Sequence, residues 1–365
     1  MKFLDKILSP FQVAMKQSLE SYIRLETSDN EETLAASDGS LLTYVRIHGN
    51  RQLVGEEEYA HLIEGATIKI GSRFDRQGHA CQVYFVRDPE RISRHLEDLM
   101  RPSRQTAIDT GLAVADIFDE RVRHLSRYLS YEECYFVLWT RPSILTKNEM
   151  SRAIKESRNK KWVNAGQAQY PLAAIDALRT RHRSFIASVM SSIDELGMAG
   201  EVLNVHDGLR AVKNNLYPSK SHENWQACLP GDVMPPRAPM SKNDLSDILW
   251  PPLKQQLALA DAQIINESLV RIGDKIWGGA DITLAPMDPS PFPMLLNRLF
   301  DAKVPYRISF LIEGGGAYSI GLRAFAATIL GVTNALNKQI KYSLEGLQRL
   351  ARKEPVVRLR VSMAT

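Results

Sequence analysis

Two stretches of this chain share one order of predicted elements, and that order constrains the fold more than any single motif does. In the first stretch, Asp38-Gly39 separates two apolar runs at 34–37 and 41–47. An Asp-Gly pair in such a place is a strong hairpin signal, because the tight turn needs a positive φ that glycine adopts freely. The residues after this hairpin predict a helix, a strand, further helices and a last strand.

Spacing and capping residues place the elements of the first stretch. Apolar residues at helical spacing predict a helix from about 59 to 70, and Asp88-Pro89 predicts the start of another, since aspartate caps a helix and proline suits its first position. Ser103 is predicted to cap a longer, separate helix. The strands are expected at 81–86 and 134–139, and the second is apolar without alternation, as in strands covered on both faces.

The same order returns after residue 266. A hairpin is predicted around Gly273-Asp274, followed by a helix, a strand at 304–312, further helices and a strand at 356–361. We therefore predict a mixed α/β fold with two lobes of the order hairpin, helix, strand, helices, strand. The expected divisions are 1–140 for an N-terminal amphipathic segment plus the first lobe, 141–265 for an insertion, and 266–365 for the second lobe.

The predicted insertion differs from both lobes. It carries helical patterns at 171–196 and 199–216 and then six prolines between Pro230 and Pro252, which indicate a linker or wrapping loop. The amphipathic segment at 3–26 is expected to pack as a helix on its own domain. Its mixture of basic and apolar residues leaves docking to a membrane surface or a partner as the alternative.

Composition limits the class of protein. The chain has 365 residues, 44% of them hydrophobic and 24% charged, which suits a globular protein of about two domains. A formal net charge of +4 over this length does not demand a nucleic-acid partner. Cys81, Cys134 and Cys228 are few and far apart, which argues against a disulfide framework and favours the cytoplasm. No apolar run approaches the ~20 residues that span a bilayer, and no signal peptide is predicted.

No phosphate-binding motif is complete. The one Lys-Ser pair, Lys220-Ser221, lacks the glycines of a P-loop. Gly314-Gly315-Gly316 follows a predicted strand and precedes a predicted helix, where a phosphate loop would lie. Ser319, however, stands where the dinucleotide fingerprint needs its third glycine, so a flexible turn is the favoured interpretation.

Two basic runs are candidate nucleic-acid contacts, because lysine and arginine can bind phosphates in a salt-sensitive way. Solvated helix faces are the favoured interpretation, and a nucleic-acid partner is not expected. The first run is Lys155, Arg158, Lys160 and Lys161 beside Trp162, and the second is Arg179, Arg181 and Arg183.

Among the histidines, His182 is the strongest candidate for a specific role, since helical spacing places it on the apolar face of the 171–196 helix. At such a position a core histidine with hydrogen-bond partners is favoured over a catalytic one. Asp119 and Glu120 are expected on a solvated helix face. The sequence assigns no catalytic, cofactor-binding or metal-ligating residue, and no enzyme activity is predicted for this chain. The other histidines without metal-ligand spacing are His48, His61, His79 and His95.

Residues 269–313 resemble the N-terminal region of the large type IV secretion and conjugation ATPases, the family of the fourth Vir component. That family has a strand ending in glycine, a second strand ending in proline, a helix with paired leucines, and a strand beginning Pro-Tyr-Arg. Asp38-Gly39-Ser40, with Gly49 beyond the next strand, also fits the family's opening hairpin. The matching residues in the longer stretch are 270–273, 282–286, Leu295-Leu296 and 305–310.

The resemblance, which is greatest to members from Dot/Icm type IVB systems and I-type plasmids, implies a non-catalytic scaffold and oligomerisation domain. The family's ATPase domain lies C-terminal to this region, so ATP and Mg²⁺ are expected there. Self-association as a hexamer or hexamer of dimers is implied, with other secretion ATPases and inner-membrane components as partners, at the cytoplasmic face of the inner membrane. The alternative is a freestanding nucleic-acid-binding protein using 155–183, and the third possibility is an enzyme with a pocket at 314–316.

Overall fold

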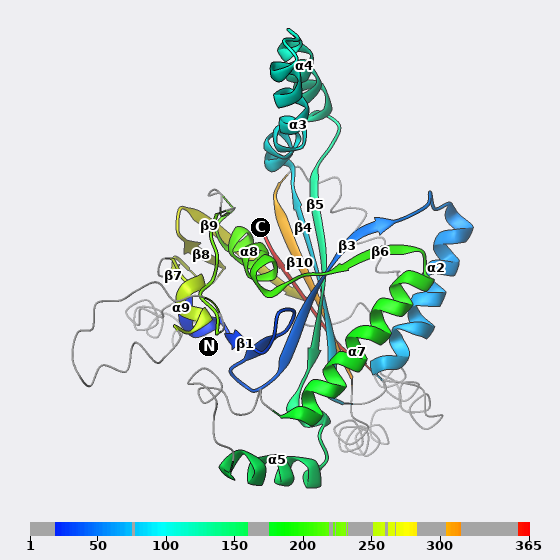
Figure 1. Cartoon of the computed structure of the whole chain (residues 1–365), viewed down its shortest axis with the longest axis vertical. Coiled ribbons are helices and arrows are strands. Elements are labelled where there is room, and N and C mark those ends of the chain that lie inside the picture. Colours follow the sequence, from blue (N-terminus) through cyan, green and yellow to red (C-terminus); the bar gives the residue numbers. More distant parts are fainter. Residues whose placement is uncertain are drawn as a thin grey trace, which may run out of the picture.

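The computed structural model describes residues 19–74, 77–159, 175–218, 222, 224–230, 232, 251–259, 262–266, 268–282, 304–314 and 357–365 (Figure 1). Residues 3–18 of the predicted amphipathic helix, the predicted helix around 294–300, those at 318–336 and 342–352, and most of the proline-rich segment lie outside these residues. The prediction of a helix over 3–26 is wrong at its end, because Leu19–Tyr22 form a short 3-10 turn and Leu25–Ser28 a strand. Both predicted hairpin turns fall within the described ranges.

One sheet holds the described strands together. The strands are β1 (Leu25–Ser28), β2 (Leu34–Ala36), β3 (Leu41–Asn50), β4 (His79–Asp88), β5 (Tyr131–Thr140), β6 (Met198–Val202), β7 (Ala262–Ile264), β8 (Leu269–Ile272), β9 (Lys275–Ile282), β10 (Tyr306–Gly314) and β11 (Val357–Ala364). Their order is β1-β2-β3-β5-β4-β10-β11-β9-β8-β7, and β6 pairs with β3. Each pairing between these strands is antiparallel.

Helices cover both faces of the sheet and extend beyond its ends (Figure 1). In the described ranges the α-helices are α2 (Glu56–Lys69), α3 (Ile92–Asp109), α4 (Ala115–Leu125), α5 (Lys147–Asn159), α7 (Asp176–Glu195), α8 (Val205–Leu216) and α9 (Leu253–Leu257). Short 3-10 turns lie at η1 (Leu19–Tyr22), η2 (Gly71–Phe74), η3 (Pro89–Arg91) and η4 (Pro142–Ile144).

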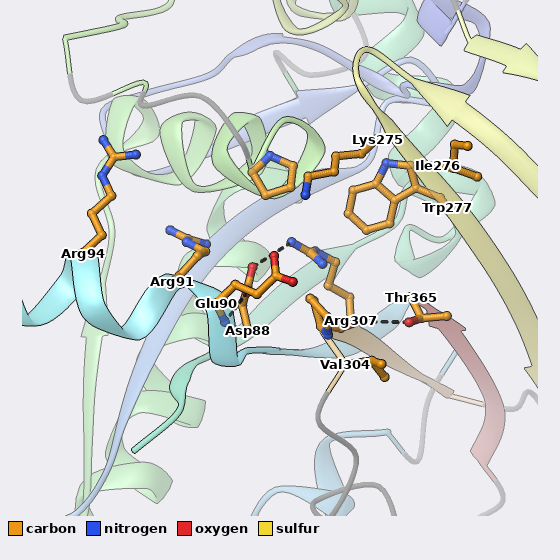
Figure 2. Close-up of a pocket in the computed structure, with 12 residues that line it drawn as sticks. Asp88, Glu90, Arg91, Arg94, Lys275, Ile276, Trp277, Val304, Arg307 and Thr365 are labelled. Carbon is orange, nitrogen blue, oxygen red and sulfur yellow. Dashed lines mark hydrogen bonds and ion pairs between the residues drawn. The ribbon is translucent and has the colours of Figure 1, made fainter. Parts of the chain in front are cut away.

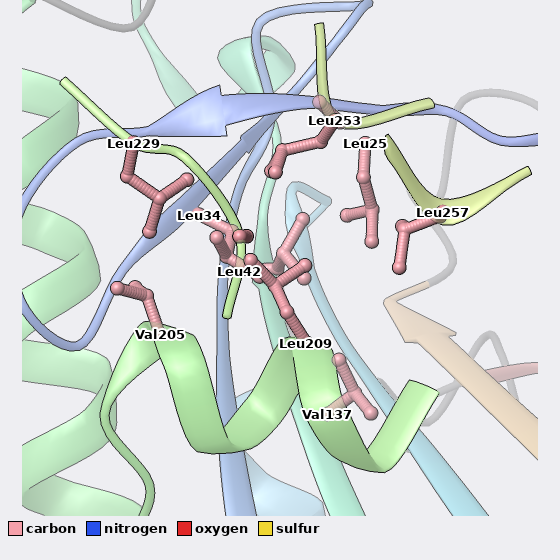
Figure 3. Close-up of a cluster of buried hydrophobic side chains, with 11 residues drawn as sticks. Leu25, Leu34, Leu42, Val137, Val205, Leu209, Leu229, Leu253 and Leu257 are labelled. Atoms are coloured by element: carbon pink, nitrogen blue, oxygen red, sulfur yellow. The ribbon is translucent and has the colours of Figure 1, made fainter. Parts of the chain in front are cut away.

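The core is split between the two faces because neighbouring residues of a strand point in opposite directions. Val137 of β5 packs in the cluster beneath α8 and α9, together with Leu42 and Leu209 (Figure 3). Leu138, the next residue, packs in the cluster beneath α7, together with Val189. Each fully buried leucine contributes about 1.5–3 kcal/mol relative to an exposed one, so both helices are fixed to the sheet by apolar burial.

The helices α3 and α4 form an arm that projects from one end of the sheet (Figure 1). The prediction that a new helix starts at Ser103 is wrong, because α3 continues through Pro102 and Ser103 to Asp109. The break falls instead at Gly111, whose φ of 69° lies in the left-handed region that ends helices. The arm is therefore a helical hairpin whose two members pack together through Leu96 and Val122, among others.

The predicted mixed α/β class is confirmed. Both predicted hairpins are present, and Asp88 caps η3 by accepting a hydrogen bond from the Glu90 amide at 3.2 Å. The strands of the two predicted lobes, however, belong to one sheet: β10 lies between β4 of the first lobe and β11 of the second. Backbone hydrogen bonding on both sides of β10 joins the two stretches.

The prediction of a helix throughout 199–216 is wrong at its start. Gly197, with φ of 71°, ends α7, and the next residues pair with β3 as the edge strand β6. The helix α8 begins only after Asn204, whose side chain caps it by accepting from the Asp207 amide at 2.9 Å. Pairing with an available strand edge outweighs the helical preference of this short segment.

Candidate functional site

A cavity of about 470 Å³ lies where the start of β10 meets the end of β4, η3, the start of α3 and the β9 strand (Figure 2). Its size is within the range of small-molecule sites. Its charged lining residues come from two parts of the chain that are far apart in the sequence, and cations outnumber anions by four to two. They are Arg91, Arg94, Lys275 and Arg307, with Asp88 and Glu90.

Arg307 is the most buried of the four cations, with 5% of the residue exposed. Its guanidinium lies between Asp88 and Trp277 (Figure 2), 4.4 Å from the centre of the Trp277 ring. The distance from Nη2 to Oδ2 of Asp88 is 3.8 Å, which is an ion pair but too long for a hydrogen bond. Burial lowers the pKa of Arg307, and the nearby Tyr84 and Asp88 oppose that shift.

Several N–H donors around this cavity have no acceptor among the residues that the structure describes. Nε and Nη2 of Arg307, Nη1 of Arg91 and Nε1 of Trp277 are all buried without a hydrogen-bond partner. A buried donor left unsatisfied costs about 1–3 kcal/mol. Guanidinium and indole groups donate hydrogen bonds and accept none, so these side chains suit the binding of an acceptor rather than proton transfer.

His182 lies where the sequence predicted it, in the core, 1% exposed. Thr43 Oγ1 donates to the Glu32 carbonyl at 2.9 Å, so it accepts from Nε2–H of His182 at 3.0 Å. Nδ1 of His182 then accepts from Thr140 Oγ1 at 2.9 Å. Both ring nitrogens are satisfied in the neutral form, and burial lowers the pKa of His182 to about 3. This confirms a partnered core histidine.

His79 belongs to the same region. Its ring stacks on Phe185 with the ring centres 4.1 Å apart, and burial lowers the pKa of His79 to about 4. The other candidate histidines lie apart from it: His48 forms an exposed pair with Glu201 at 3.2 Å, His61 is exposed on α2, and His95 lies edge-on to Tyr131 in the arm.

Two arginines of the second basic run form hydrogen bonds and ion pairs within the molecule. Arg179 donates to Asp29 through Nε at 2.8 Å, and Arg181 binds Glu149 at 2.6 Å and also the Ile144 carbonyl. Arg183 is exposed on α7. Of the first run, Lys155 is exposed on α5, the backbone of Arg158 continues that helix, and Lys160, Lys161 and Trp162 lie outside the described residues.

Asp119 and Glu120 are exposed on α4, as predicted, and Asp119 pairs with Arg104 of α3 at 2.7 Å. Gly314 is the last residue of β10, while Gly315 and Gly316 lie outside the described residues, as do Lys220 and Ser221. Of these candidates, the ones that the structure describes (Asp119, Glu120 and Gly314) do not line the basic cavity.

The arm, taken with the turns that follow α3 and α4, exposes several large apolar side chains. Its five most exposed large apolar residues are between 59% and 74% exposed. They are Leu99, Ile108, Leu112, Ile117 and Tyr128. Single exposed apolar residues are ordinary on protein surfaces, but a group on one projecting element marks a candidate interaction surface.

Within the described ranges, no group of three or more histidine, cysteine, aspartate or glutamate side chains is placed to hold a metal ion. Nor does that part of the chain contain a helix with the length and apolar character needed to cross a bilayer. Comparison with models of known protein families finds no match, and comparison with curated proteins finds no significant one.

Sequence reasoning missed the cavity because its residues come from segments far apart in the chain. One signal was present: Arg307 is a lone cation in the apolar strand predicted at 304–312. A charge inside an otherwise buried strand needs a compensating group. That requirement directs attention to Arg307, although spacing alone does not find Asp88 or Trp277 beside it.

Proposed function

We propose that this chain is the non-catalytic N-terminal scaffold of a type IV secretion or conjugation ATPase of the Dot/Icm kind. It would serve in self-association and in contacts with other secretion ATPases and components of the inner membrane, at the cytoplasmic face of that membrane. The support from sequence is the resemblance of residues 269–313. The matching residues that the structure describes lie on β8, the turn after it, the end of β9, and β10.

The apolar arm is the observation that carries the proposal. A scaffold needs a surface that a second copy can cover, and exposed apolar side chains gain about 25 cal/mol per Å² when they are removed from water. The arm projects beyond the sheet, so a neighbouring subunit can reach it without disturbing the core (Figure 1). We expect the arm to lie in the contact between subunits.

Light scattering after size exclusion tests this role. Ile108 and Leu112, 70% and 61% exposed, are both changed to glutamate. Because these side chains are exposed, the fold is expected to survive, while burying two carboxylates in a contact weakens association about tenfold or more. The matched control is Ile68→Glu on α2, where the isoleucine is 64% exposed.

The expected result is an oligomer for the wild-type chain and the control, and a shift towards monomer for the arm variant. A monomeric wild-type chain over the whole concentration range, or equal masses for the wild type and the arm variant, would contradict the proposal. The chain is also expected to show no ATP turnover of its own.

The alternative of a nucleic-acid-binding protein depends on 155–183. Arg179 and Arg181 are engaged in internal contacts, which leaves fewer cations for phosphates in this run. Fluorescence anisotropy with DNA over a salt series separates the two functions, because phosphate contacts give a steep salt dependence. Such a slope would favour the alternative over the scaffold.

A further inference from the structure

We propose that the basic cavity binds a small phosphate monoester, with the phosphate seated against the Nε and Nη2 edge of Arg307. This inference is independent of the scaffold role, since it concerns another part of the molecule than the arm. It is argued from unsatisfied donors, charge and the shape of the lining.

The unsatisfied donors point to a ligand with several acceptor oxygens. Nε and Nη2 of Arg307 form the side of the guanidinium that binds an oxyanion through two parallel hydrogen bonds. Within the described ranges both are buried without a hydrogen-bond partner. Arg91 and Trp277 also line the cavity, and each has a further buried donor without a partner there, Nη1 and Nε1 respectively. A phosphate monoester presents three terminal oxygens, which match this set better than the two oxygens of a carboxylate.

The charge of the lining also matches a dianion. Four cationic side chains exceed the two acidic ones by two positive charges. Arg94 and Lys275 are exposed, so they can contact a ligand from the rim while Arg307 holds it from inside. Arginine and lysine together are common in phosphate sites, arginine for its geometry and lysine as a point charge.

The rest of the lining favours an organic group on the phosphate. Ile276, Trp277, Val304 and Pro305 contribute apolar surface. A cavity of about 470 Å³ is far larger than one inorganic phosphate needs. We therefore expect an uncharged apolar group to lie against these side chains and to add affinity to that of the phosphate.

Asp88 predicts a variant in which the affinity for an anion should increase. Its Oδ1 accepts the hydrogen bond from the Glu90 amide, which holds the carboxylate at the end of β4. Its Oδ2 lies 3.8 Å from Nη2 of Arg307, so a bound anion would meet the Asp88 charge. Asparagine can cap in the same way but carries no charge. Asp88→Asn should thus tighten anion binding, the opposite of what removing a cation does.

Calorimetric titration with inorganic phosphate, phenyl phosphate, benzoate and phenol tests the proposal, with Trp fluorescence as a second readout. Phenyl phosphate should bind one to one and more tightly than inorganic phosphate, and phenol should not bind. Arg307→Met should weaken phenyl phosphate about tenfold or more, and Lys275→Met by a smaller factor. The control is Arg271→Met, an exposed arginine of the neighbouring strand β8 that is not among the lining residues.

Circular dichroism shows which variants keep the fold. If Arg307→Met does not fold, Lys275→Met and Asp88→Asn still test the site, because they must change the affinity in opposite directions. The proposal is overturned if neither phosphate compound binds saturably, if benzoate binds as tightly as phenyl phosphate, or if the cavity variants bind as the Arg271→Met control does.

Discussion

The buried His182 predicts a dependence of stability on pH. In the folded chain this imidazole is neutral, with a pKa of about 3 against an ordinary value of 6.5. The unfolded chain therefore binds a proton below pH 6.5 that the folded chain does not take up until about pH 3. The contribution of the neutral His182 to the free energy of unfolding is therefore fully present above pH 6.5 and is lost progressively as the pH falls below that value.

The magnitude comes from the two pKa values. Between about pH 7.5 and 5.0, protonation of the unfolded imidazole lowers the free energy of unfolding by about 2 kcal/mol, while the folded form stays neutral. His79, with its pKa lowered to about 4, adds a loss of similar size over the same range. The comparison that isolates His182 is therefore between the wild type and a variant without that titrating group.

The assay is urea unfolding followed by circular dichroism at several pH values, for the wild type and His182→Gln. Glutamine retains one donor and one acceptor for Thr43 and Thr140 but does not titrate in this range. We expect the variant to lose about 2 kcal/mol less than the wild type between pH 7.5 and 5.0. Parallel pH profiles for the two proteins would refute the assignment of a neutral, doubly bonded His182.

Two further predictions concern stability. Leu209 is fully buried in the cluster beneath α8, so Leu209→Ala should lower the free energy of unfolding by about 2–5 kcal/mol. Leu112→Ala, at an exposed position of the arm, should change that free energy little. Urea unfolding of the two variants measures the difference. Gly111→Ala should lower the stability of the arm by about 1–2 kcal/mol, because its φ of 69° strains any residue with a Cβ although no atom lies within 4 Å. The control is Gly71→Ala, where an added Cβ also meets no atom within 4 Å but the glycine has no positive φ. The measurement is hydrogen exchange of the α3 and α4 amides. Equal protection of these amides in the two variants would contradict the argument.

Local signals in the sequence predicted much of the fold. The Asp38-Gly39 turn, the Asp88 cap and the long apolar run of β5 each depend on residues a few positions apart, and each is present. The strand β6 was missed because its identity depends on pairing with β3, which lies far away in the sequence. The position of β10 beside β4 was missed for the same reason.

The candidate site depends even more than the fold does on contacts between residues that are far apart in the sequence. His182 could be placed in the core from helical spacing alone, since its neighbours lie on the same helix. The cavity depends on contacts between β4, β9 and β10, and its chemistry depends on which donors remain without acceptors. That property arises only when the side chains are packed, so residue types and spacing do not reveal it.

The place of β10 has a consequence for how the protein folds as it is synthesised. Gln82 of β4 donates to Ser309 of β10 at 2.8 Å across 227 residues of sequence. Until a ribosome has made β10, the edge of β4 that faces it has no partner and can pair with a strand of another nascent chain. The middle of the sheet is therefore completed late in synthesis, and a chaperone that covers this edge of β4 would protect the nascent chain from such pairing.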